Sequence, residues 1–289
     1  MQHKILIIIV TYNGMKFADK CFGGFGGLPQ GFEVLAFDNN STDNTVEHIK
    51  NKYPFVKIIE SKENLGFGKA NNAGLRMALD NGFDYAFLLN QDAWISGEDI
   101  RKLAEVQSKN EDYYIVSPLH YNGSGTDFDI GFKGYIDKSG SPVLLDFAKN
   151  EYKELYETKG INAAAWLISR KCLNEIGGFS PSFFHYSEDD NYTDRVRYHK
   201  KKIGVSPLAL MYHDRENNFH VGEHHVKKVH LIRKRIYDIS RPEKKTNISE
   251  ILKYLITSIR VGGGLAQMLK LRDIIRNKNK SRTIGQTFL

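Results

Sequence analysis

KILIIIVTYN, residues 4–13, is the stretch that decides the fold of this chain. Six consecutive apolar residues, five of them β-branched, run from Ile5 to Val10. A strand with one face in water alternates apolar and polar residues, so a continuous run predicts a central strand of a parallel sheet covered on both faces. The polar residues 11–13 then stand at the carboxyl end of this strand, which is where open α/β sheets bind their ligands.

The first half of the chain alternates strand and helix patterns. Strand patterns recur at residues 32–37, 56–60 and 85–89, and helical spacing ends near Lys50 and covers residues 70–79. The polar cluster at residues 38–43 supplies Ser and Thr as N-caps for the first of these helices. This order predicts right-handed βαβ units and an α/β fold with a doubly wound, mostly parallel sheet that has helices on both faces.

The second half of the chain is less regular. Its patterns predict helices at 97–108, 171–176 and 188–200, and strands at 113–117, 162–169 and 203–212. Residues 120–146, rich in Gly, Asp and aromatics, predict loops and short hairpins, and the pattern beyond Gly222 is helical. We therefore predict one domain over residues 1–221, with a nucleotide-binding half at about 1–95 and an acceptor half at about 96–221, and a helical C-terminal extension over residues 222–289.

Length and composition predict a globular protein that is made and kept in the cytosol. A chain of 289 residues can bury a substantial core. No stretch approaches the roughly 18 apolar residues of a membrane span, and the first apolar run begins too close to Met1 for a secretory signal. Cys21 and Cys172 lack a CxxC partner, which favours buried free thiols over a disulfide or a zinc site.

Polar side chains follow every strand of the predicted parallel sheet. The strands end at residues 11–13 (TYN), 38–40 (DNN), Asn64 and 90–92 (NQD). One such end is usually a loop with a capping residue, but four that converge on one edge favour a nucleotide site. Neither GxGxxG nor GxxxxGK[ST] follows the first strand, so a divalent cation, Mn²⁺ or Mg²⁺, is the usual remaining means of holding a diphosphate. Asp92 is the best placed carboxylate to bind it.

In their order and spacing, five motifs resemble those of family 2 glycosyltransferases of the GT-A fold, particularly the rhamnosyltransferase-like branch. They are residues 10–13 (VTYN), 38–43 (DNNSTD), 64–72 (NLGFGKANN), 88–92 (LLNQD) and 177–189 (GGFSPSFFHYSED). The resemblance covers about residues 4–214. It implies an inverting, metal-dependent enzyme that moves a sugar from a nucleoside diphosphate sugar to a saccharide or lipid-linked saccharide acceptor, in cell-surface polysaccharide or glycan synthesis.

The resemblance also implies roles for the matched positions. The donor nucleotide would contact Thr11, Tyr12, Asn13, Asp38, Asn40, Asn64, Lys69, Asn72 and Gln91. The metal would be held by Asp92 and by His213, for which the alternative is a purely structural histidine. The family often has Asp-x-Asp where this chain has Asn90-Gln91-Asp92, so one acidic ligand is absent and the metal affinity should fall.

Residues 188–195 (EDDNYTDR) resemble the Glu-Asp-x-Asp-x-x-x-Arg motif of the family, which places Asp189 at the position of the general base. The alternative is that these acids only stabilise the first turn of a helix through its dipole, which would lower the carboxylate pKa and weaken the base. Glu188, Arg195 and Trp166 are weaker candidates for contact with the acceptor or the sugar. Trp166 either stacks on an acceptor ring or belongs to the core.

Two other functions stay open at this point. A nucleotidyltransferase that makes sugar nucleotides shares this architecture, although residues 12–15 (YNGM) do not match its Gly-rich basic signature. A non-catalytic nucleotide-sugar-binding domain would explain Asn90 and Asn191 in place of acids. None of the nucleic-acid-binding motifs appears, so we expect no nucleic acid partner.

The C-terminal extension is basic. Residues 215–289 hold 17 Lys and Arg against 6 Asp and Glu, which leaves 24 against 28 for residues 1–214. Ile251, Leu252, Leu255, Ile256 and Ile259 recur at helical spacing and form one apolar face. We expect this face to pack on the catalytic domain or on a second copy in a homodimer. The alternative is peripheral contact with the inner face of the cytoplasmic membrane, where anionic lipid attracts basic residues.

Overall fold

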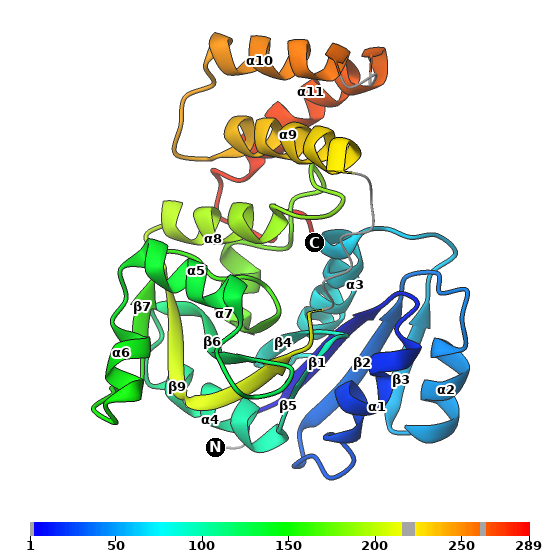
Figure 1. Cartoon of the computed structure of the whole chain (residues 1–289), viewed down its shortest axis with the longest axis vertical. Coiled ribbons are helices and arrows are strands. Elements are labelled where there is room, and N and C mark those ends of the chain that lie inside the picture. Colours follow the sequence, from blue (N-terminus) through cyan, green and yellow to red (C-terminus); the bar gives the residue numbers. More distant parts are fainter. Residues whose placement is uncertain (1–2, 216–222, 261–263) are drawn as a thin grey trace.

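The computed structural model describes residues 3–215, 223–260 and 264–289, and Figure 1 shows a central sheet with a stack of helices at one end. The strands are β1 (Ile5–Thr11), β2 (Phe32–Asp38), β3 (Val56–Glu60), β4 (Tyr85–Asn90), β5 (Ala93–Ile95), β6 (Tyr113–Asn122), β7 (Tyr156–Thr158), β8 (Ala165–Ser169) and β9 (Lys202–His213). The helices are α1 (Met15–Gly23), α2 (Thr45–Lys52), α3 (Phe67–Asp80), α4 (Gly97–Ser108), α5 (Ile130–Ser139), α6 (Val143–Ala148), α7 (Arg170–Glu175), α8 (Glu188–Tyr198), α9 (Glu223–Ser240), α10 (Ile248–Arg260) and α11 (Gly264–Lys280).

The sheet is parallel in its first half and mixed in its second. The strand order is β3-β2-β1-β4-β8-β6-β9-β5, with β7 paired to β9 outside this path. Strands β1, β2, β3 and β4 run parallel to one another, whereas β8 runs antiparallel to both β4 and β6. Strand β9 is parallel to β6, and β5 and β7 each pair antiparallel with β9. The predicted doubly wound half is therefore confirmed.

Strand β1 has a continuous apolar sequence because both of its faces are buried. Ile5, Ile7 and Ile9 belong to the core under α1, α2 and α4. Leu6 and Ile8 belong to the opposite core, which includes side chains of α3, α7 and α8. All five side chains have no exposed surface. The predicted helices on both faces are therefore present, and Figure 1 shows them on either side of the sheet.

The structure differs from the sequence-based prediction in three short elements and one segment. Helix α1 and strands β5 and β7 were not predicted, and residues 120–146 hold the end of β6 together with α5 and α6 rather than hairpins. Helix α5 has a sequence with two glycines, so its intrinsic helix propensity is low. Its ends are well capped, because the Asp129 side chain accepts from Phe132 N and Gly140 adopts φ of 68°. Cys21 and Cys172 are buried free thiols, as predicted.

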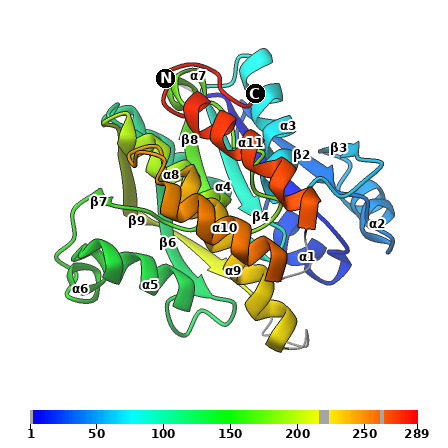
Figure 2. The same ribbon diagram turned by 90° about the horizontal axis from the view of Figure 1, so that it is seen from above.

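Helices α9, α10 and α11 pack around a small core of their own. Its buried members are Ile236, Ile239, Tyr254 and Ile274, together with Phe183 from the first domain. Helix α9 lies on α8, since the Tyr237 hydroxyl donates to Asp194 Oδ2 at 2.7 Å. Figure 2 shows α10 and α11 side by side above α9. The predicted domain boundary between residues 221 and 222 lies outside the described residues.

The apolar face predicted for residues 251–259 is divided in the structure. The buried residues of α10 are Tyr254, Thr257 and Ser258, which lie against the other two helices of the extension. Leu252 and Ile256 are exposed. This face does not pack on the catalytic domain, because the packed side of α10 is shifted around the helix and faces α9 and α11. Contact of the face with a second copy stays a prediction.

Candidate active site

The carboxyl ends of β1 and β2 are joined by a buried carboxylate. Asp38 Oδ1 accepts from the Thr11 hydroxyl at 2.9 Å and from the Ser41 hydroxyl at 2.6 Å, and Oδ2 accepts from Ser41 N at 2.8 Å. Thr11 and Asp38 are both buried. Asp38 therefore fixes the loop that follows β2, and it places a negative charge just beneath the edge of the sheet.

The loop after β1 presents the exposed part of this edge. Gln91 holds its backbone, because Gln91 Oε1 accepts from Tyr12 N at 2.8 Å and Gln91 Nε2 donates to Tyr12 O at 3.1 Å. The Tyr12 side chain remains 45% exposed. Asn13 and Asn40 are exposed at left-handed φ angles of 47° and 69°, a conformation that Asn tolerates better than most residues. Tyr12 and Asn40 are thus available to a ligand, whereas Gln91 supports the loop. Asn13 Oδ1 accepts from Thr42 N at 2.8 Å, which leaves the Nδ2 group of Asn13 for a ligand.

The loop after β3 connects this edge to α8. Asn64 Oδ1 accepts from Asn39 Nδ2 and from Gly66 N, both at 2.9 Å. Phe67 N donates to the backbone oxygen of Phe184 at 3.2 Å. A Cβ atom on Gly68 would lie 3.0 Å from Phe179 Cβ and 3.8 Å from Glu188 Cβ, so the first turn of α3 approaches the first turn of α8 closely. Lys69 is exposed on the same turn of α3.

Asn72 and Arg195 have structural partners, which contradicts the contacts predicted for them. Asn72 accepts from Phe179 N at 2.7 Å and donates to Phe179 O at 2.9 Å and Phe288 O at 3.2 Å. The buried Arg195 guanidinium donates to the backbone oxygens of Ile176 and Gly178 and to the Thr287 hydroxyl. Their hydrogen-bonding groups bind the protein itself, so neither is placed to bind the donor or the acceptor.

Trp166 is part of the core. Its side chain has no exposed surface, and its ring stacks on Phe179 with centroids 6.1 Å apart and an interplanar angle of 11°. Tyr192 lies at 5.8 Å from the same ring. A sugar ring cannot reach either face of the indole, so the prediction of acceptor stacking is wrong and the core alternative holds.

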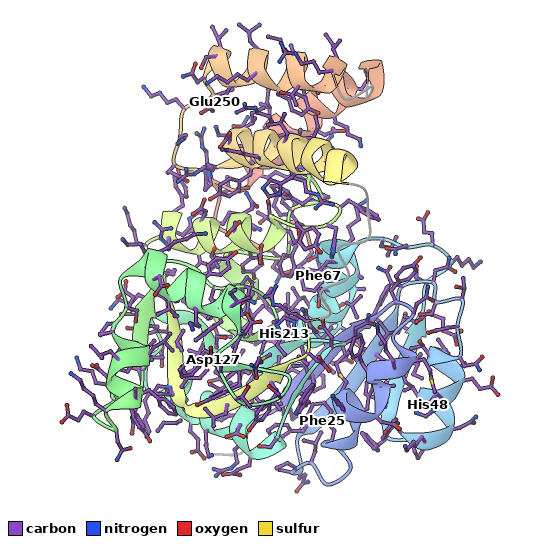
Figure 3. All side chains as sticks on the ribbon, viewed as in Figure 1. Phe25, His48, Phe67, Asp127, His213 and Glu250 are labelled. Atoms are coloured by element: carbon purple, nitrogen blue, oxygen red, sulfur yellow. The ribbon has the colours of Figure 1, made fainter. Side chains whose placement is uncertain are left out.

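Asp92 and His213 lie together because β5 pairs with the end of β9. Ala93 stands opposite His213, and Asp214 N donates to Asp92 O at 2.8 Å. This pairing brings His213 Nε2 to 3.3 Å from Asp92 Oδ1. Figure 3 shows His213 near the middle of the molecule, where the sheet meets the helices above it. The side chain of Asp92 is partly exposed and that of His213 is buried. A ligand would therefore reach the pair from the Asp92 side.

Asp129 is a second acid beside His213, and the sequence did not reveal it. Its Oδ2 lies 3.6 Å from His213 Nδ1 and accepts from Arg215 Nε at 2.6 Å, while its Oδ1 caps α5. Carboxylates therefore face both ring nitrogens of His213, Asp92 at Nε2 and Asp129 at Nδ1, so the imidazole lies between two acids. The available signal was Asp129 as an N-cap, but residues 120–146 were interpreted as loops.

The acids at the start of α8 are held in a poorly solvated setting. Glu188 is buried and Asp189 is half-buried. Burial, and then the neighbouring charges of Asp190 and Glu188, raise the pKa of Asp189 to about 8. The net shift is upward because desolvation and like charges outweigh the backbone amides of the first turn, which act in the opposite direction. Asp190 has a separate partner, the Tyr135 hydroxyl at 2.8 Å.

Several buried polar atoms near this edge lack a hydrogen-bond partner among the described residues. Asn90 Oδ1, both amide atoms of Asn162 and Glu188 Oε2 are examples. Asn90, the last residue of β4, donates through its backbone N to Ala164 O at 2.9 Å. Asn162 precedes Ala164 by two residues. Leaving such an atom unpaired costs about 1–3 kcal/mol, and native proteins rarely leave several together. We therefore expect a ligand or ordered water at this position.

Solved structures identify the fold of this chain. GalNAc-T7 with UDP, GalNAc and Mn²⁺ superposes with a TM-score of 0.60 at 17% identity, covering 87% of this chain and 54% of that chain, so this chain spans about half of it. Mannosyltransferase PcManGT from Pyrobaculum calidifontis, in complex with GDP-Man and Mn²⁺, superposes with a TM-score of 0.59 at 14% identity, covering 97% and 74%. The fold is therefore that of the GT-A glycosyltransferases.

The sequence places the chain within this class. The family profile described as Glycosyl transferase family 2 matches residues 6–177, and the chain belongs to this family. It is 26% identical over 224 residues to the low-salt glycan biosynthesis hexosyltransferase Agl10 of Haloferax volcanii, covering 74% of this chain and 68% of that protein. It is 24% identical over 253 residues to the N-acetylglucosaminyl-diphospho-decaprenol L-rhamnosyltransferase of Mycobacterium tuberculosis, covering 78% and 82%. The chain is thus a rhamnosyltransferase-like glycosyltransferase, as the motifs predicted.

Proposed function

We propose that this glycosyltransferase transfers a sugar from a nucleoside diphosphate sugar to an acceptor hydroxyl, with inversion at the anomeric carbon. Three features support the proposal. They are the exposed loop after β1, the pair formed by Asp92 and His213, and the acidic first turn of α8, which contacts the first turn of α3. The names of the relatives support a role in glycan or cell-surface polysaccharide synthesis.

The donor would lie along the exposed residues of this edge. Tyr12, Asn13, Asn40 and Lys69 offer an aromatic ring, two amides and an ammonium group that are accessible from solvent. These groups suit a base, a ribose and a diphosphate in turn. The two similar structures contain UDP and GDP-Man, which supports a nucleoside diphosphate sugar as donor.

A divalent cation would be held by Asp92 and His213. The pair supplies one oxygen donor and one nitrogen donor. Within the described residues, no group of three His, Cys, Asp or Glu side chains could hold a metal, so other ligands would have to come from the donor diphosphate or water. The residues fit, because Asp92 Oδ1 and His213 Nε2 lie 3.3 Å apart, close enough to share one cation, and carboxylate oxygen and imidazole nitrogen are both ligands that such cations accept. When bound, the cation neutralises the charge that develops on the leaving diphosphate. Asn90 in place of an acid lowers the charge of the site and its metal affinity.

Asp189 would act as the general base. The acceptor oxygen forms a bond to the anomeric carbon, the bond from this carbon to the diphosphate oxygen breaks, and the acceptor proton passes to the Asp189 carboxylate. Such a base contributes about 10²- to 10⁴-fold to the rate. A pKa near 8 matches a proton acceptor that works close to neutral pH better than an ordinary aspartate does.

The acceptor we propose is a lipid-linked saccharide. The mycobacterial relative is named for an N-acetylglucosaminyl-diphospho-decaprenol acceptor. Glu188 remains a candidate for contact with the acceptor or the sugar, because its buried Oε2 has no partner among the described residues.

The proposal is tested by incubating the protein with UDP-, GDP- and dTDP-sugars and a saccharide acceptor, with Mn²⁺, with Mg²⁺ and with chelator. We expect release of one nucleoside diphosphate that needs the cation, and a product whose anomeric configuration is opposite to that of the donor. Retention of configuration would refute the proposed mechanism. Pyrophosphate release from a sugar 1-phosphate and a nucleoside triphosphate would instead identify a nucleotidyltransferase.

A further inference from the structure

The outer face of α10 carries a row of exposed apolar side chains. Ile248, Leu252, Ile256 and Ile259 are 74%, 52%, 48% and 61% exposed. At 100° per residue these four positions fall within a narrow arc of the helix, and we call them the α10 ridge. Surface apolar residues are common singly, but a continuous apolar row on one helix marks an interaction surface.

The ridge points away from the catalytic domain. Helix α9 lies on α8, and α10 packs against α9 and α11 through Tyr254 and its buried neighbours. Figure 1 shows α10 as the outermost element of the stack, and Figure 2, seen from above, shows it unobstructed. A broad flat surface can therefore approach the ridge without contacting the sheet.

The surroundings of the ridge are strongly basic. Residues 241–289 hold 11 Lys and Arg against 3 Asp and Glu. Lys253 and Arg260 are exposed on α10 beside the ridge, and Lys270 and Arg272 are exposed on α11. Two copies that met through this face would bring like charges together, which opposes a dimer, whereas an anionic lipid surface would attract all of them.

The length of α10 also fits a helix that lies on a bilayer. It has 13 residues, whereas a spanning helix needs about 20. No helix in the described parts of the chain is long and apolar enough to cross a membrane. An amphipathic helix with basic residues on either side of its apolar face is the type that lies in the plane of the headgroups.

We propose that the α10 ridge docks this protein on an anionic lipid bilayer. The four ridge side chains enter the boundary between headgroups and acyl chains, and the flanking lysines and arginines contact the lipid phosphates. This docking is a property of the extension and does not depend on the proposed chemistry. It would hold the enzyme at the surface where a lipid-linked acceptor resides.

The test compares flotation of the full chain with vesicles of phosphatidylcholine alone and with vesicles that also contain phosphatidylglycerol. We expect binding only to the anionic vesicles, and weaker binding as salt is added. In the variant Leu252→Ser with Ile256→Ser, the partition coefficient should fall at least about tenfold, because the burial of each large aliphatic side chain contributes about a factor of ten. The matched control is Ile130→Ser with Leu145→Ser, which alters side chains that are 81% and 57% exposed on α5 and α6 and should bind as the unchanged protein does.

Three results would overturn the proposal. They are no binding of the full chain to anionic vesicles at low salt, unchanged binding of the ridge variant, and equal loss in the control variant. If the protein is a dimer in solution that only the ridge variant converts to a monomer, and vesicles are not bound, the ridge is an interface between two copies. The rate of sugar transfer to a water-soluble acceptor is measured on the same variants. This rate tests the proposed chemistry without the membrane, so failure of the docking inference is distinguished from failure of the proposed chemistry.

Discussion

At the scale of single residues, Asp189 has an unusual electrostatic setting. It lies in the first turn of α8 between Glu188 and Asp190, in a position where burial leaves little water to solvate a charge. The amide of Asp190 donates to Asp189 Oδ1 at 2.8 Å, and the backbone amides of Asp190 and Asp189 both lower the pKa, but they do not offset desolvation and two acidic neighbours. The carboxylate form of Asp189 is therefore a stronger base than that of an ordinary aspartate.

The same pKa shift predicts how stability depends on pH. The Asp189 pKa is raised from 3.8 to about 8, so the folded state binds more protons than the unfolded state between these values. The contribution of Asp189 to stability is therefore full at low pH and is lost as pH rises toward about 8. Asp189→Asn, which keeps the side chain neutral, should gain stability relative to the unchanged protein as pH increases. Urea unfolding at about pH 5 and about pH 9 checks this, and a difference that does not change with pH would contradict it.

A second prediction at this scale concerns Asp129 as a positioning residue for His213. Asp129→Asn keeps an N-cap for α5 but removes the charge that faces His213 Nδ1. We expect the Mn²⁺ affinity to fall about 10- to 100-fold while the helix content stays the same. The control is Asp127→Asn, an exposed acid that pairs only weakly with Lys133 at 3.4 Å. Calorimetric titration with Mn²⁺ measures both, and equal affinities would rule out this role for Asp129.

At the scale of elements, strands and helices with strong hydrophobic patterns were predicted correctly, and helices with weak patterns were missed. The apolar run of β1 has one explanation, burial on both faces, and β3 and α4 have the predicted bounds. Helix α1 has no side-chain N-cap and is followed by a Gly-rich segment, so its pattern is masked. Helix α5 depends on its caps rather than on its propensity. Because Asp129 belongs to α5, the missed helix also concealed a residue of the site.

The loop between β3 and α3 gives a prediction about an element. Gly66 has φ of 78°, and a Cβ atom there would clash with the backbone oxygen of Phe184. Gly66→Ala should therefore force the loop away from α8, lower the free energy of unfolding by roughly 2–4 kcal/mol and weaken donor binding. Gly82→Ala is the matched control, because Gly82 has φ of 73° with open space around it. It should cost only about 1 kcal/mol of backbone strain and leave donor binding unchanged. Equal losses of stability in the two variants would show that the contact with α8 is unimportant.

At the scale of the whole molecule, the last residues of the chain return to the catalytic domain. Gly178 N donates to Thr287 O at 2.8 Å, and Gly285 N donates to Glu175 O at 2.9 Å. Arg195 joins this contact from α8, and its guanidinium also lies over the Phe288 ring at 4.8 Å. The sequence motif assigned Arg195 to the acceptor or sugar. Its partners are backbone oxygens 17 and 19 residues earlier and the Thr287 hydroxyl 92 residues later, and no local pattern reports such contacts.

Loss of this contact should destabilise the whole protein. Arg195→Met leaves the carbonyl oxygen of Gly178 without its donor and removes one of the two donors to Ile176 O, so the free energy of unfolding should fall by roughly 2–4 kcal/mol. Arg197→Met changes an exposed arginine two residues away and should cost less than about 1 kcal/mol. Denaturant titration of both variants measures the difference. Similar losses would show that the chain end is held by other contacts.

The central claim is that the start of α8 supplies the base for transfer from a donor bound at the sheet edge. The most direct test is the kcat for sugar transfer by Asp189→Asn, measured together with its affinity for the donor in the presence of Mn²⁺. Asparagine keeps the shape of the side chain and cannot accept the proton, so kcat should fall at least about 100-fold while donor affinity is unchanged. A kcat close to that of the unchanged protein would contradict the assignment of Asp189 as the base.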